Sequence, residues 1–148
     1  LELTADQPQV FGAFQCPINP VDAGAEHSFI ASVLPTALKR EMAPLAMKTL
    51  ADGRFFASKD MNGRAVWRSD NPLIPEAMSL EDCIGFALSL PISCLIVGAE
   101  KPEYIRDKAE MARRHHEMTE AQRTALVDKV ADYLEQVGNP KVEYYKRG

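Results

Sequence analysis

The stretch that decides the fold is residues 91–108, which read PISCLIVGAEKPEYIRDK. Its first half, Ile92–Val97, is a run of apolar and β-branched side chains that ends at Gly98 and Ala99. Pro102 follows shortly afterwards, and proline favours the first turn of a helix. A strand, a turn of small residues and a helix start therefore succeed one another. Free N–H groups at such a helix start attract anions, although an ordinary strand-to-helix turn has the same pattern.

The size and composition of the chain predict one soluble globular domain. It has 148 residues, of which 46% are hydrophobic and 26% are charged, values that are ordinary for such a domain. The net charge of −4 and the pI of about 5.4 argue against nucleic acid as a partner, because nucleic-acid binding requires a basic face. No apolar run approaches the ~20 residues of a membrane span, so we expect no membrane partner.

The three cysteines, Cys16, Cys83 and Cys94, lie among apolar residues and form no metal-binding spacing. We expect buried free thiols, no metal site and a reducing compartment, which predicts a cytoplasmic protein. The chain begins with Leu1 rather than Met. We therefore expect a piece of a longer protein, in which an export signal could be missing.

Hydrophobic periodicity predicts strands that alternate with helices. Two of the helices begin with a capping box or a variant of one, in which Ser79 is followed by Asp82 and Thr119 by Gln122. Pro35 is expected to kink or shorten the first helix. The strands are expected at 10–15, 43–47 and 92–97, and the helices at about 22–40, from 79, at 102–115 and at 119–138.

The remaining segments are a long loop and a tail. Residues 51–78 form the loop, in which Asn62 and Gly63 predict a hairpin turn, and residues 139–148 form the tail. Alternating strands and helices indicate a parallel sheet. A three-stranded parallel sheet has two open edges, so we expect a second copy or a missing part of the protein to complete it.

Three strand ends resemble those in the C-terminal half of the aldo/keto reductases. Residues 15–19, QCPIN, are similar to the Q-x-x-x-N at the end of the family's sixth strand. Residues 46–50, AMKTL, resemble the end of its seventh strand. Val97–Ala99, followed by Pro102 and Glu103, resembles its eighth strand and the next helix. The resemblance implies a (β/α)8 TIM barrel, of which residues 1–148 would be the C-terminal part, covering about strands six to eight, in a divergent bacterial-type member.

The resemblance also implies an activity, the NAD(P)H-dependent reduction of a small aldehyde or ketone without a metal. Gln15 would bind the nicotinamide carboxamide, unless it is only a polar residue at a strand end. Met47 stands where many members stack a Tyr on the nicotinamide. Lys48, Thr49 and Leu50 would run beside the pyrophosphate, and the alternative for Lys48 is a surface lysine on a loop.

At the adenine end, the resemblance implies six further cofactor-binding residues. Many members have Lys-Ser where this chain has Gly98 and Ala99. Many also have an Arg where this chain has Tyr104, and the Tyr104 ring would stack on adenine. Lys101 would serve a 2′-phosphate, so NADPH is expected, with NADH as the alternative. Asp107 and Lys108 stand where Glu and Asn often hold the adenine.

No catalytic residue is expected within this chain. The family's catalytic Asp, Tyr, Lys and His come from the first half of the barrel, and nothing in this sequence corresponds to them. The first hypothesis is therefore a carbonyl reductase to which this chain contributes the cofactor-binding half. The alternative is an inactive half-barrel that dimerises, or that binds a nucleotide or a partner without turnover.

Overall fold

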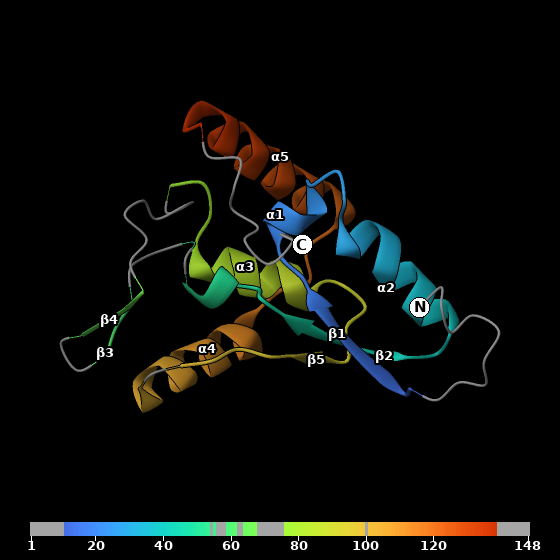
Figure 1. Ribbon diagram of the computed structural model, residues 1–148, viewed down its shortest axis with the longest axis horizontal. Coiled ribbons are helices and arrows are strands. Elements are labelled where there is room, and N and C mark those ends of the chain that lie inside the picture. The colour runs from blue at the N-terminus through green and yellow to red at the C-terminus, as the bar shows by residue number, and fades with distance from the viewer. Residues whose placement is uncertain are drawn as a thin grey trace.

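The computed structural model describes residues 11–53, 55, 59–61, 64–67, 76–99 and 101–138. Within these residues, helices and strands alternate along the chain (Figure 1). The strands are β1 (Ala13–Pro17), β2 (Ala43–Met47), β3 (Lys59–Met61), β4 (Arg64–Trp67) and β5 (Cys94–Leu95). The helices are α1 (Pro20–Ala23), α2 (Phe29–Lys39), α3 (Leu80–Leu88), α4 (Pro102–Arg114) and α5 (Glu120–Gln136), with a 3₁₀ turn at Ala51–Gly53.

Three parallel strands form the central sheet in the order β1-β2-β5 (Figure 1). In the register of this sheet, Gln15 lies opposite Leu45, which lies opposite Cys94 on its other side. Strands β3 and β4 pair with each other in antiparallel fashion. The predicted hairpin turn at residues 62–63 lies outside the described residues.

The prediction of a (β/α)8 barrel is wrong. The described part of the chain is a small α/β domain with a three-stranded parallel sheet and five α-helices, and it does not show strands six to eight of a barrel. Local alternation of strand and helix does predict a parallel sheet, as observed. Alternation does not determine how many strands a sheet has or whether it closes, because both depend on pairing between distant segments.

Helix starts follow local sequence closely. The Ser79 side chain accepts from the Asp82 N–H at the start of α3, while the Asp82 carboxylate accepts from the Ser79 N–H. Thr119 and Gln122 form the same reciprocal pair at the start of α5. Both predicted capping boxes are therefore confirmed, and α4 also begins at the predicted Pro102.

The predicted helix at 22–40 is instead two helices, α1 and α2, because polar side chains start a new helix at each place. Asn19 accepts from the Asp22 N–H in α1, and Ser28 accepts from the Ala31 N–H in the first turn of α2. Helix α2 continues past Pro35 to Lys39. It ends in a Schellman motif, in which the Met42 N–H donates to Ala37 at 3.1 Å and the Glu41 N–H donates to Leu38 at 3.0 Å. Glu41 has a φ of 53°, a left-handed conformation that usually favours glycine.

The core consists of two clusters. One lies between the sheet and helices α2 and α3, and its buried members are Cys16, Ile18, Leu34, Ala46 and Ala87. The other gathers side chains of α1, α3 and α5 around the fully buried Phe55, and it includes Val21, Met78, Cys83 and Val130. In Figure 1, α5 lies beside α1, on the side of the molecule opposite α4.

The second face of the sheet is only partly covered. Side chains alternate between the two faces of a strand, so the residues that do not point to α2 and α3 share this face. Pro17 is buried, but the other residues of this face are exposed or half-buried, and all are uncharged: Ala13, Gln15, Ala43, Leu45, Met47, Cys94 and Ile96. The prediction that all three thiols are buried is therefore wrong for Cys94, whose strand has no neighbour on its outer edge in the described sheet.

Candidate functional site

The carboxyl ends of the three parallel strands meet at one edge of the sheet, which we call the carboxyl edge. Backbone bonds fix its geometry: the Ile18 N–H donates to Met47 at 3.0 Å, and the Ile96 N–H donates to Ala46 at 2.8 Å. Ligands of open parallel sheets bind beyond this end of the strands. The described segments at this edge are residues 15–19, 46–53, 96–99 and 101–104.

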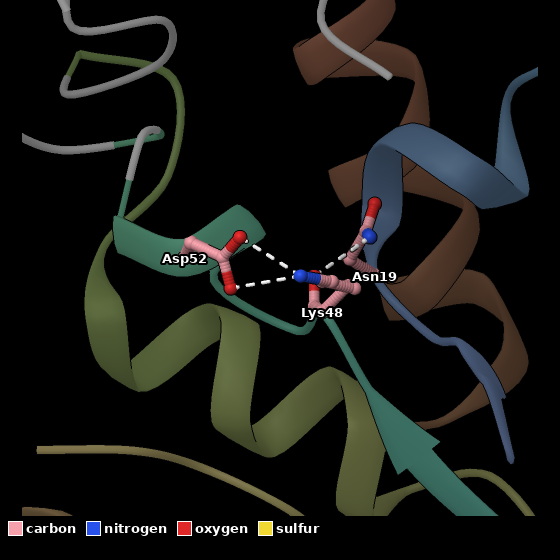
Figure 2. A network of polar contacts seen from close by, with 3 residues as sticks. All are labelled: Asn19, Lys48 and Asp52. Atoms are coloured by element: carbon pink, nitrogen blue, oxygen red, sulfur yellow. Dashed lines mark hydrogen bonds and ion pairs between the residues drawn. The ribbon is translucent and has the colours of Figure 1, made fainter. Parts of the chain in front are cut away.

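Asn19 joins two of these segments (Figure 2). It is fully buried and caps α1, because its Oδ1 accepts from the Asp22 N–H at 2.9 Å. Its Nδ2 donates to the Lys48 carbonyl oxygen at 3.1 Å. The side-chain amide suits this position because it offers an acceptor and a donor together. One side chain thus caps a helix and holds the backbone at the end of β2.

Asp22 is a second buried polar residue behind this edge. Its carboxylate accepts from the Ser28 hydroxyl at 3.0 Å, from the Phe29 N–H at 3.2 Å and from the Ile30 N–H at 3.0 Å. The last two N–H groups belong to the first turn of α2, where a negative charge is favoured. Burial, together with the nearby Asp22 carboxylate, raises the pKa of the Cys16 thiol to about 11.

The backbone after β2 is left-handed at several residues. The φ angles are 55° at Lys48, 48° at Ala51, 58° at Asp52 and 85° at Gly53. Two tight turns accompany them, because the Ala51 N–H donates to Lys48 at 2.9 Å and the Gly53 N–H donates to Leu50 at 2.7 Å. Non-glycine residues rarely adopt this conformation, and when they do they often lie at functional sites.

The Lys48 side chain turns back onto this loop and binds Asp52 (Figure 2). Its Nζ lies 2.9 Å from Oδ1 and 2.8 Å from Oδ2 of Asp52. The two side chains are 23% and 47% exposed, so the pair is accessible to solvent. Lys48 is thus a lysine on a loop after β2, and its ammonium has a carboxylate partner in Asp52.

The other residues predicted at the ends of β1 and β2 differ in exposure. Gln15 is exposed, and Met47 is half-buried on the same second face of the sheet. Leu50 packs against the cluster around Phe55. Thr49 is 1% exposed, and its hydroxyl is the one buried side-chain polar atom without a hydrogen-bond partner among the described residues. Such a group has a free-energy cost that a partner would remove.

The third segment carries the residues predicted at the adenine end. Gly98 and Ala99 follow β5, and the Lys108 ammonium donates to the Gly98 carbonyl oxygen. Lys101 is the N-cap of α4 but makes no side-chain capping bond. Its Nζ lies 5.8 Å from the centre of the Tyr104 ring, which is 44% exposed. This segment therefore has exposed cations and an exposed aromatic ring, and Asp107 is exposed on the same helix.

The hydrogen bonds thus form two groups at the carboxyl edge. Asn19, Lys48 and Asp52 make up the first, and Gly98 with Lys108 makes up the second. The sequence pointed to Lys48, Gly98 and Lys108. It did not point to Asp22 or Asp52, and Asn19 was only part of a motif. The Asn-Pro pair at 19–20 was the available signal, because Asn is a good N-cap and Pro suits the first helical position.

Two kinds of site are not found in the part of the chain that the structure describes. There, no three His, Cys, Asp or Glu side chains are grouped so that they could hold a metal ion. None of the described helices has both the length and the apolar character needed to cross a membrane.

Comparisons of this chain with family models, with curated proteins and with solved structures found no match. The resemblance to the aldo/keto reductases therefore rests only on the sequences of the three strand ends.

Proposed function

We propose that this chain binds a nicotinamide dinucleotide at the carboxyl edge and is the cofactor-binding part of an oxidoreductase that reduces small aldehydes or ketones. When bound, the cofactor would supply the hydride. The proton donor would come from residues outside this chain, since none of its residues matches the catalytic set of the aldo/keto reductases. A small α/β domain with a parallel sheet suits this role, because such sheets bind nucleotides at this edge.

One observation carries the proposal. The three segments that resemble the aldo/keto reductases, at residues 15–19, 46–50 and 97–99, are far apart in sequence, yet all lie at the ends of neighbouring parallel strands. If these three segments lay far apart in the fold, they could not contact the same ligand. Three neighbouring strand ends can contact one extended molecule.

The residues at this edge fit such a cofactor. A pyrophosphate beside residues 48–50 would meet the Lys48 ammonium, whose side chain is partly exposed. At the other end, Tyr104 offers a ring for stacking, and Lys101 and Lys108 offer positive charge. The two lysines favour NADPH over NADH, because the 2′-phosphate adds negative charge. Gln15 is exposed and free to contact a carboxamide.

The direct test is calorimetric titration of NADPH into the chain and into two lysine variants. Lys48→Met removes the cation that follows β2 at the carboxyl edge, whereas Lys129→Met removes an exposed cation from α5. We expect saturable NADPH binding that Lys48→Met weakens at least fivefold and Lys129→Met leaves unchanged. The absence of saturable binding, or equal effects of the two variants, would refute the proposal.

A second proposal, of a different class, is that the chain is a non-catalytic module that forms a dimer through the second face of its sheet. Parallel sheets are normally covered on both faces. Here Leu45 and Met47 are half-buried, and Ile96 is 43% exposed. The face has no charged residue, so two copies of a chain with net charge −4 would meet where they repel least. The exposed Gln15 amide could pair with its copy, because an amide is both donor and acceptor.

Sedimentation equilibrium distinguishes this second proposal from the first. A dimer that uses this face should dissociate when Ile96→Glu places a charge on it. Val137→Glu is the matched control, because Val137 is 49% exposed at the end of α5. A monomeric wild-type chain, or a dimer that Ile96→Glu leaves intact, would exclude the proposal.

A further inference from the structure

We infer that Asp52 competes with the bound anion for Lys48 and so sets the affinity of the carboxyl edge for phosphate groups. This inference rests on the proposed function and deepens it. Lys48 follows β2 directly, and its ammonium is held by both carboxylate oxygens of Asp52, at 2.9 and 2.8 Å (Figure 2). A phosphate group that binds this ammonium has to displace the carboxylate or share the cation with it.

The position of Lys48 is fixed independently of Asp52. Its carbonyl oxygen accepts from the Asn19 side chain at 3.1 Å and from the Ala51 N–H at 2.9 Å. These two bonds hold the main chain of Lys48 from both sides. Loss of the carboxylate would therefore leave the base of the lysine in place and remove the carboxylate that competes for its ammonium.

The pair is weak enough for exchange. Both side chains are partly exposed, at 23% and 47%, and ion pairs in contact with solvent contribute little to stability because water screens them. A pyrophosphate has more negative charge than one carboxylate and several strong acceptor oxygens. The Lys48 ammonium can therefore exchange Asp52 for a phosphate group. The competition with Asp52 nevertheless lowers the affinity of the carboxyl edge for phosphate.

The backbone conformation of Asp52 allows a substitution that removes its charge without straining the loop. Asp52 has a φ of 58°, and asparagine tolerates this left-handed conformation well. Asp52→Asn therefore suits the backbone of this loop and removes the negative charge. Asp128→Asn is the matched control for net charge, because Asp128 is an exposed carboxylate on α5.

The experiment measures dissociation constants for inorganic pyrophosphate and for NADPH by calorimetry. The chains are the wild type, Asp52→Asn, Lys48→Met, the double variant and Asp128→Asn. We expect Asp52→Asn to tighten pyrophosphate binding about five- to tenfold and Asp128→Asn to change it less than about twofold, as for a distant screened charge. In the Lys48→Met background, Asp52→Asn should have no more effect than the control, because the competition needs the lysine.

The outcomes separate the inference from the proposed function. Tighter pyrophosphate binding by Asp52→Asn without NADPH binding would support the inference and refute the proposed cofactor. NADPH binding that Asp52→Asn weakens, or changes no more than Asp128→Asn does, would overturn the inference and leave the proposed function standing. An effect of Asp52→Asn that persists in the Lys48→Met background would also overturn it. If neither ligand binds any of the chains, both fail.

Discussion

The Asn19 amide nitrogen donates to the Lys48 carbonyl oxygen at 3.1 Å, and this bond joins the ends of β1 and β2 at the carboxyl edge. The same side chain caps α1 through its oxygen. The position of Lys48 therefore depends on a residue that lies 29 positions earlier in the chain. Because Asn19 is fully buried, water cannot replace either bond when the side chain is removed.

Asn19→Ala should lower the free energy of unfolding by about 2 kcal/mol, because it removes a helix cap and leaves the part-buried Lys48 carbonyl with one donor fewer. Asn19→Ser keeps an oxygen that can cap α1 but lacks the amide donor, so about half of the loss should return. Urea denaturation of the three proteins measures the difference. Equal stability of the alanine and serine variants would show that the cap contributes nothing.

Asp22→Asn should be more costly, because a carboxylate that accepts three hydrogen bonds is replaced by a group with only one acceptor atom. We expect a loss of about 2–3 kcal/mol in the free energy of unfolding, since the donors that lose their partner are in a buried region. Asp128→Asn should stay within about 0.5 kcal/mol of the wild type, as for most surface substitutions. Urea denaturation would contradict this account if both variants were equally stable.

The Schellman motif at the end of α2 allows a stabilising substitution. Glu41 adopts a φ of 53°, and Glu41→Gly should raise the free energy of unfolding by about 0.5–1 kcal/mol, because glycine adopts this conformation without steric cost. The reciprocal control is Gly138→Ala after α5, where φ is 63° and a loss of about 1 kcal/mol is expected. Thermal unfolding should show opposite shifts, and a destabilised Glu41→Gly would contradict the prediction.

The sequence predicted the features that depend on near neighbours. The capping boxes at Ser79 and Thr119 were correct because both partners lie within three residues of each other. The strand at Ala43–Met47 was also correct, because a short run of small and apolar residues between a helix and a turn has few alternatives.

The features that depend on distant contacts were missed. The strand expected at 92–97 is only Cys94–Leu95, since it pairs with β2 alone in the described sheet. The prediction of a barrel was wrong because the sequence at a strand end does not determine whether the sheet closes. Closure depends on pairing between strands that are distant in the sequence. Asp52 was missed because its role depends on the left-handed turn that brings it back to Lys48.

The three thiols should react at different rates. Burial raises the pKa of Cys16 to about 11 and raises that of Cys83 further, with Asp22 and Asp82 adding to the effect. A raised pKa means less thiolate at pH 8, and the thiolate is the reactive form. Cys94 is exposed, so iodoacetamide at pH 8 should label it first, and peptide mass analysis identifies the site. Rapid labelling of Cys16 or Cys83 in the folded protein would contradict this order.

The most direct measurement of the central claim is a titration of the ¹⁵N-labelled chain with NADPH, followed by two-dimensional NMR. If the carboxyl edge binds the cofactor, the amide signals of Gln15, Lys48–Gly53 and Gly98–Tyr104 should shift together and saturate at one concentration. Signals from the middle of α5 should stay in place. No shift at all, or shifts that gather away from the ends of β1, β2 and β5, would contradict the account.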